Sequence, residues 1–184
     1  MKDKRENATP EQIIKERRIK LRDREALSTL LQKTLVMILA VTVIFCLIFG
    51  LTSMKGGDME PKISAGDLLL YYRLQSDYVR NDVVIMERDD GQYVGRVIAL
   101  PGENINISTS GIISIDGNNI YESDIYFETK PYPDTGRDPR TMGGDEYFIL
   151  GDRRESAKDS RYFGPVKKSE IKGKVITSIN RIGL

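Results

Sequence analysis

One uncharged apolar run constrains this chain more than any other feature of its sequence. The residues between Lys33 and Lys55, TLVMILAVTVIFCLIFGLTSM, number twenty-one and carry no formal charge. A helix of that length spans about 30 Å, which is the thickness of the hydrocarbon core of a bilayer. A buried globular helix rarely stays uncharged for so long, and the run is too long for a secretory leader and lacks an Ala-x-Ala-like end. We therefore predict a single transmembrane helix over residues 34–54.

The segment before this run is positively biased. Residues 1–33 carry ten Lys or Arg against six Asp or Glu, a net charge of +4. Basic flanks stay on the cytoplasmic side, so we expect a single-pass protein of the cell membrane with residues 1–33 in the cytoplasm and 55–184 outside. The charges suit a solvated flank that sets the orientation, and a tail that binds a partner is the alternative.

The composition of residues 55–184 excludes several chemistries. This part carries eighteen basic against twenty-one acidic residues, and a net charge of −3 argues against nucleic acid as a partner. The chain has no histidine, which removes Ser-His-Asp triads, Cys-His pairs and His-rich metal sites. The one cysteine, Cys46, lies in the apolar run, so the exterior part has neither a disulfide nor a thiolate. We expect no metal and no cofactor.

The exterior part is typical of a mainly β fold. Its segments rich in Val, Ile, Leu, Tyr and Phe are short and bounded by Gly, Asp, Asn or Pro, as strands are. Asp90-Gly91 and 116–118 predict hairpin turns, and 128–144 predicts a Pro/Gly-rich loop. A β-barrel or sandwich is the expected class. The predicted strand segments are 66–74, 82–88, 92–100, 112–120, 146–152 and 171–184.

Three motifs follow one another in this β-rich part. The first is Gly-x-x-Met-x-Pro followed by Gly-Asp, at Gly56, Met59, Pro61, Gly66 and Asp67. The second is YVGRVIALPGENI at 93–105, and the third is ILGDRRESAKDSRYFGPV at 149–166. Each is a weak pattern alone. Together, in this order and behind one N-terminal anchor, they resemble the type I signal peptidases.

The resemblance implies where a catalytic pair would stand. In that family a serine directly precedes Met-x-Pro, and a lysine directly precedes Arg-Val-Ile-x-x-Pro-Gly. Burial lowers the pKa of such a lysine, which then takes the serine proton so that the hydroxyl attacks the scissile carbonyl. Carried over by position, the serine is replaced by Asp58 and the lysine by Gly95. The nucleophile and the base are therefore both absent, and we expect no catalytic residues.

The third motif keeps its framework but loses a supporting residue. It matches the family's Gly-Asp-Asn-Arg-x-x-Ser-x-Asp-Ser-Arg at Gly151, Asp152, Arg154, Asp159, Ser160 and Arg161. Arg153 stands where the family has asparagine, and Ala157 where a serine supports the lysine, with Ser156 one place off. The resemblance implies that Asp152 and Asp159 make structural hydrogen bonds and an ion pair with Arg161.

Two ways of compensating for the lost pair remain open at this point. Ser53, Ser64, Lys55 and Lys62 are near Asp58 in sequence. Ser53-Met54 matches the family's Ser-Met, but Lys55-Gly56 follows it where x-Pro is needed. An acidic pair of Asp58 with Asp152 or Asp159 is the other route, although structural roles suit those two acids better.

The family's fold has a groove that receives an extended peptide, near the membrane surface, and binding there needs neither serine nor lysine. We expect Asp58, Met59, Pro61 and Gly95 to line that groove, with the strand at 66–74 close to lipid. A chain that keeps groove and anchor without the catalytic pair resembles the signal-peptidase-like accessory proteins of Gram-positive pilus gene clusters. That resemblance implies a pseudoenzyme that binds a pilin, a pilus sortase, or a signal or sorting peptide. The alternatives are an active peptidase with an altered site and a purely structural membrane protein.

Overall fold

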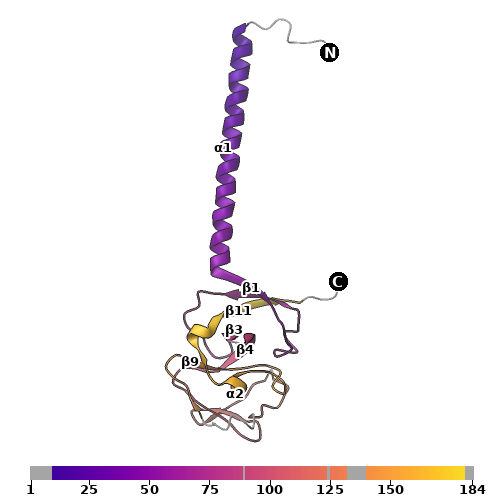
Figure 1. The fold of residues 1–184 in the computed structure, drawn as a ribbon, viewed down its shortest axis with the longest axis vertical. Helices are drawn as coiled ribbons and strands as arrows, with labels where there is room; N and C mark the ends of the chain where they lie inside the picture. Colours follow the sequence, from indigo (N-terminus) through magenta and orange to yellow (C-terminus); the bar gives the residue numbers. More distant parts are fainter. Residues whose placement is uncertain (1–9, 89, 124, 132–139, 181–184) are drawn as a thin grey trace. The chain divides into compact units, whose positions relative to one another are not determined.

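The computed structural model describes residues 10–88, 90–123, 125–131 and 140–180. It divides the chain into two compact units, Met1–Cys46 and Leu47–Leu184. The described part of the first unit is helical, and the second unit consists mainly of strands (Figure 1). The mainly β class predicted from the sequence is therefore confirmed.

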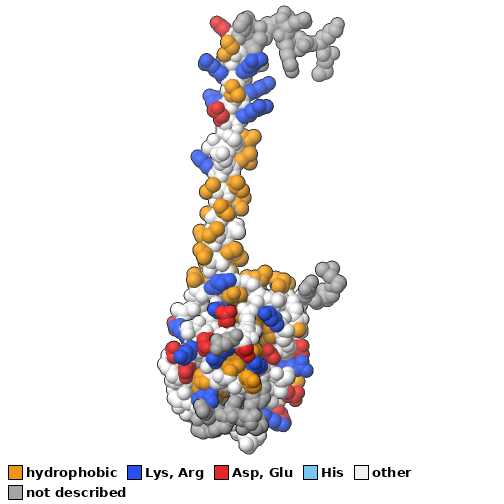
Figure 2. Space-filling model, viewed as in Figure 1, with side chains coloured by type: hydrophobic (Ala, Val, Ile, Leu, Met, Phe, Trp, Pro, Cys, Tyr) orange, Lys and Arg blue, Asp and Glu red, His pale blue; other side chains and the backbone are white. Residues whose placement is uncertain are grey.

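One helix, α1 (Pro10–Ile48), contains both the charged flank and most of the apolar run. Proline suits its first position because the N–H that proline lacks has no partner there in any helix. Its stretch Lys20–Ile48 is long and apolar enough to cross a membrane, with a mean hydropathy of 2.3 over its most apolar window. Lys and Arg side chains gather on the N-terminal half of α1 and apolar side chains on the C-terminal half (Figure 2).

The predicted end of this helix was wrong by six residues. The helix ends at Ile48, and β1 (Phe49–Ser53) begins at the next residue. The reason is tertiary: every residue of Phe49–Ser53 faces a partner on β2 (Leu68–Tyr72) in an antiparallel pair. Hydropathy does not distinguish a membrane-spanning segment from a strand that pairs beside it. The apolar part of the helix still has sufficient length to span a membrane, because it extends back past Lys33, the only charged residue between Ala26 and Ile48.

The strands form two antiparallel sheets. The larger has the order β1-β2-β11-β3-β4-β9-β10, and the smaller has the order β7-β6-β5-β8. The remaining strands of the larger sheet are β3 (Val83–Arg88), β4 (Gly91–Ala99), β9 (Glu146–Leu150), β10 (Val166–Lys167) and β11 (Ile171–Ile179). Those of the smaller sheet are β5 (Asn104–Ile107), β6 (Ile113–Ile115), β7 (Asn118–Ile120) and β8 (Arg140–Thr141). Two short helices, α2 (Ser160–Phe163) and η1 (Lys168–Glu170), lie between β9 and β11.

Most predicted strands are present, and both predicted hairpins form, between β3 and β4 and between β6 and β7. The sequence patterns did not predict β1, β5, β8, β10 or α2. Part of the predicted loop at 128–144 is strand β8, residues 132–139 of that loop lie outside the described residues, and so do residues 181–184 of the last predicted strand.

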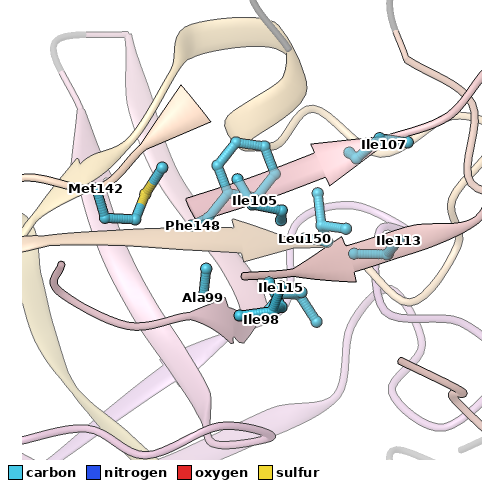
Figure 3. Packing of buried hydrophobic residues seen from close by; sticks show 9 residues of the cluster. All are labelled: Ile98, Ala99, Ile105, Ile107, Ile113, Ile115, Met142, Phe148 and Leu150. Carbon is cyan, nitrogen blue, oxygen red and sulfur yellow. The ribbon is translucent and has the colours of Figure 1, made fainter. Parts of the chain in front are cut away.

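Buried side chains form three apolar clusters. In the first, isoleucines of β5 and β6 pack against the ends of β4 and β9 (Figure 3). The other two lie beside the larger sheet, and one of them includes Met59 from the turn between β1 and β2. The same core thus fixes the turn that carries Asp58.

Candidate functional site

The turn between β1 and β2 presents Asp58. Asp58 is half-buried, whereas the next side chain, Met59, is fully buried in the core. Pro61 is exposed and follows a cis peptide bond. Met59 thus anchors the turn from within, and the whole residue is shielded from the surface.

Two backbone N–H groups of the loop after β9 hold Asp58. The N–H of Arg153 donates to the Asp58 carbonyl oxygen at 2.9 Å. The N–H of Lys158 donates to the Asp58 carboxylate. Burial raises the pKa of this carboxyl above its usual value, the nearby Asp159 raises it further, and the Lys158 N–H opposes both effects. The Asp58 side chain is thus a bonded part of the structure.

An ion pair reinforces the same junction. Arg153 Nη1 lies 2.7 Å from Glu60 Oε2, and both side chains are more than a third exposed. Arg153 is the position at which the third motif departs from the family pattern. In this chain it joins the loop after β9 to the turn of Asp58 both through its backbone and through its side chain.

Gly95 lies in β4, and there is no space beside it for a side chain. A Cβ atom on Gly95 would stand 2.6 Å from Cγ2 of Ile149 and 3.1 Å from the Leu150 carbonyl oxygen. Contacts below about 3 Å force a neighbour to move. Ile149 is itself fully buried in β9. Gly95 carries no functional group, and the neighbouring strand fills the space beside it.

Ala157 packs against the same strand end. It is fully buried, and its Cβ would lie 2.4 Å from a Cβ on Gly151. That hypothetical Cβ would also lie 2.7 Å from the Asp58 carbonyl oxygen. Gly151 is therefore required for the close approach of the turn and the loop.

Buried ion pairs organise the rest of the third motif. Asp159 accepts from Arg161 Nε at 2.9 Å and Nη2 at 2.8 Å, and also from the Gly151 N–H. Asp152 instead pairs with Arg96, at 2.8 Å and 2.6 Å. The expected ion pair with Arg161 thus forms for Asp159, whereas Asp152 has a different partner on β4.

Arg154 and Ser160 complete this framework. The fully buried Arg154 donates to the Gly151 carbonyl at 2.8 Å and forms a two-point contact with Glu122 at 2.7 Å and 2.6 Å. The Ser160 hydroxyl accepts from the Ile149 N–H at 2.9 Å. Hydrogen bonds to buried charges are among the strongest in proteins, so these residues hold the loop.

The two acids that could form an acidic pair with Asp58 are already engaged, Asp159 with Arg161 and Asp152 with Arg96. Asp159 already has its carboxylate oxygens bonded to Arg161 and to a backbone N–H, which leaves it unsuited to an acidic pair with Asp58. Ser53 lies in β1 opposite Leu68, and the Ser64 N–H donates to Asp67.

Lys158 is the lysine whose backbone contacts Asp58, and its side chain is held elsewhere. Its ammonium group bonds the Asp90 carboxylate, and this contact raises the pKa of Lys158 above its usual value. A lysine base requires the opposite shift, so Lys158 is unsuited to act as a general base.

Two strand edges near this turn are open, a feature that no motif indicated. β1 is an edge strand of the larger sheet. Within β4, Gly91–Gly95 pair with β3, whereas pairing with β9 begins only at Arg96. The Thr52 hydroxyl donates to Gln92 Oε1 at 2.7 Å, so the two edges lie side by side. Among the described strands, neither edge has a second partner, and each offers backbone groups to an added strand.

A surface pocket of about 410 Å³ adjoins the turn. It is lined by Glu60, Pro61, Ser64, Tyr126, Phe127 and Arg153. Of the residues predicted to bind a peptide, Pro61 therefore lines a pocket and Asp58 lies half-buried beside it, while Met59 and Gly95 are buried. Their role in peptide binding stays a prediction.

The described residues contain no group of three or more His, Cys, Asp or Glu side chains that could hold a metal ion. The expectation of no metal and no cofactor stays a prediction.

These features define a mainly β protein with an N-terminal apolar helix, in which one loop is clamped onto the turn after the first strand. Residues 27–179 match the family described as signal peptidase, peptidase S26. The chain belongs to this family.

Two relatives agree with that assignment by sequence. A signal peptidase I of Bacillus caldolyticus is 32% identical over 139 residues, which cover 66% of this chain and 74% of the relative. A probable signal peptidase I-2 of Synechocystis is 28% identical over 141 residues, covering 68% of this chain and 62% of the relative. This chain therefore spans less than two thirds of the cyanobacterial protein. A solved signal peptidase I of Enterococcus faecalis is 26% identical and covers 55% of this chain and 98% of that one, with a TM-score of 0.47.

Proposed function

We propose that this protein is a membrane-anchored pseudoenzyme of the signal peptidase family, which binds an extended polypeptide without cleaving it. The observation that carries the proposal is the state of the two catalytic positions. Asp58 is bonded to a backbone N–H, and the space for a side chain at position 95 contains Ile149.

Cleavage of a peptide bond by this family's chemistry needs a hydroxyl nucleophile and a neutral amine beside it. Losing one member of such a unit lowers turnover by about 10⁴–10⁶, and further losses then add little. Here Asp58 and Gly95 stand at the two positions that the resemblance assigns to the serine and the lysine. Lys158, whose backbone bonds Asp58, is held protonated by Asp90.

Binding does not depend on the missing groups. Among the described strands, β1 and Gly91–Gly95 have no strand on their second edge, and such edges pair readily with an extended chain. The pocket beside Pro61 adds room for a side chain of the bound segment. We therefore assign the peptide site to this region, with Asp58 at its edge.

We propose further that the partner is a pilin, a pilus sortase or a sorting segment, and that the protein assists sortase-dependent pilus assembly on the outer face of the membrane. The support is the resemblance to accessory proteins of pilus gene clusters and the apolar helix that can anchor the β unit. Deletion of the gene is expected to abolish or shorten pilus polymers without accumulation of unprocessed precursors. An Asp58→Asn copy should restore them, whereas normal polymers in the deletion strain contradict the pilus role.

The second candidate is an active endopeptidase with an altered site. Family membership favours it, and so does the raised pKa of Asp58, because a carboxyl with such a pKa transfers protons closer to neutral pH.

A cleavage assay separates the two candidates. The full chain in detergent is incubated with a fluorogenic peptide that contains a signal-peptide cleavage site, with the Bacillus caldolyticus signal peptidase I as the positive control. We expect no cleavage above buffer. Cleavage that Asp58→Asn abolishes would establish the active peptidase. If the chain neither cleaves nor binds pilin, sortase or peptide, the reading as a structural membrane protein gains support.

A further inference from the structure

Two tyrosine rings and one carboxylate surround the ammonium group of Lys158. The Lys158 Nζ atom lies 4.9 Å from the centre of the Tyr162 ring and 5.5 Å from that of Tyr93. It also bonds Asp90, and the Tyr93 hydroxyl donates to the same Asp90 oxygen at 2.9 Å. We call Tyr93, Tyr162 and Asp90 the cation cage.

The three residues of the cage come from parts of the chain that are distant in sequence. Asp90 lies at the β3–β4 hairpin, Tyr93 in β4 and Tyr162 in α2. Further packing holds the Tyr93 side: its ring lies 5.6 Å from the Phe163 ring, and the Arg88 guanidinium lies 4.7 Å from Phe163. Packing therefore fixes the Tyr93 side of the cage independently of Lys158.

The groups of the cage are accessible from solvent. The Lys158 side chain is 37% exposed and that of Asp90 is 53% exposed, and Tyr162 is 58% exposed. A surface contact of this kind contributes little net stability, because solvent screens the charges and a long side chain loses freedom in it. A second ammonium group has access to the same rings and carboxylate.

The cage also adjoins the candidate peptide site. Tyr93 lies in the half of β4 whose second edge is open, next to Gln92, which bonds Thr52. Side chains of a strand alternate between the two faces of a sheet, so every second side chain of a strand added there falls on the face of Tyr93. The backbone of Lys158 in turn bonds Asp58.

We propose that the cation cage is a recognition site for a lysine side chain of the bound partner, with Lys158 as the stand-in that this side chain displaces. Ammonium groups bind over tyrosine rings through the ring quadrupole, and the carboxylate supplies the counter-charge. The inference rests on the proposed function only for the source of the lysine, a polypeptide strand beside β4.

The first experiment tests the cage without any peptide. The full chain in detergent is labelled with 3-fluorotyrosine, and Lys158→Met is titrated with n-butylammonium chloride, with n-butanol as the neutral control. Lys158→Met removes the ammonium and keeps an unbranched stem. We expect saturable shifts of the Tyr93 and Tyr162 fluorine signals with butylammonium alone, which Asp90→Asn in the same background weakens about fivefold. Equal responses to both probes, or no response, would overturn the cage.

The second experiment tests whether the cation cage recognises a lysine side chain of a bound peptide. Two strand-forming peptides are used, one with a lysine and the other with a norleucine at the same position. Their affinities are measured for the wild-type chain, for Lys158→Met and for Lys158→Met with Tyr162→Leu. We expect Lys158→Met to raise the preference for the lysine peptide about fivefold, and Tyr162→Leu to remove it. Binding of both peptides without any preference contradicts lysine recognition and leaves peptide binding intact. If neither peptide binds while butylammonium does, the strand site fails and the cage stands.

Discussion

Cγ2 of Ile149 occupies the place where a side chain of residue 95 would begin, because a Cβ on Gly95 would stand only 2.6 Å from it. Gly95 lies in β4 and Ile149 in the neighbouring β9, where Val97 is its paired residue. Position 95, where the resemblance implies the family's lysine, is thus part of the core packing between two strands.

This contact predicts that substitutions at Gly95 and Ile149 have non-additive effects on the free energy of unfolding. We expect Gly95→Ala to lower the free energy of unfolding by about 1–3 kcal/mol, the usual cost of overpacking a core. Ile149→Ala alone should cost about 2–5 kcal/mol through the cavity it leaves. In the double variant the alanine at 95 enters that cavity, so the combined loss should be smaller than the sum, as measured by denaturation of the full chain in detergent. Ile149→Val, which keeps Cγ2, is the matched control and should give no such relief.

The same contact bears on any attempt to restore catalysis. We expect Asp58→Ser with Gly95→Lys to give a misfolded or inactive chain, and Ile149→Ala added to that pair to improve folding. Signal-peptide cleavage by the double variant at the level of the triple variant would show that Ile149 does not restrict position 95.

The buried contact of Arg154 with Glu122 predicts that lysine cannot replace this arginine. Arg154→Lys removes the two-point contact with Glu122 and the bond to the Gly151 carbonyl, and leaves buried acceptors unpaired. We expect a loss of about 3–5 kcal/mol in the free energy of unfolding. Thermal unfolding followed by circular dichroism measures it.

The exposed pair of Lys130 and Glu128 is the control for that experiment. Its side chains are 68% and 73% exposed, so Glu128→Gln should change stability by less than about 1 kcal/mol. Comparable losses at the two sites would show that burial does not set the strength of the Arg154 contact.

The pKa of Asp58 predicts the sign of a pH effect. Because burial and Asp159 raise the pKa of Asp58 in the folded state, the folded chain holds this proton more tightly than the unfolded chain does. Its contribution to stability is therefore greatest below about pH 4, the usual range of an aspartate, and falls as the pH rises through the raised pKa. Asp58→Asn keeps an acceptor for the Lys158 N–H and removes the charge. We expect the stability of this variant, relative to wild type, to increase from pH 4 to pH 7, and parallel curves would contradict the prediction.

The orientation predicted from the charge bias is testable with cysteine labelling. In a Cys46→Ser background, a cysteine in place of Tyr121, which is 92% exposed, should react with a membrane-impermeant maleimide in intact cells. A cysteine in place of Glu11, which is exposed in the charged flank, should react only after the membrane is permeabilised. The reverse pattern would place the β unit in the cytoplasm.

Much of the architecture follows from local patterns in the sequence. The strands at β2, β3, β4, β9 and β11 have short apolar segments with turn residues at their ends, and the turns at Gly91 and Gly117 follow from residue type. β1 could not be found in this way, because Phe49–Ser53 continues an apolar run without any change in composition. Its strand state depends on pairing with β2, a partner that begins only after the Asp58 turn.

By itself, the sequence determined that this chain has one segment able to span a membrane, a positively biased flank, and neither serine at 58 nor lysine at 95. These properties depend on residue type at given positions, which a sequence states directly. The tertiary structure alone decided that Ile149 occupies the space beside Gly95, that Thr52 and Gln92 join two open edges, and that the backbone of Lys158 bonds Asp58. Such contacts join residues 40 to 100 positions apart, and they are fixed by sheet register and core packing rather than by neighbouring residues.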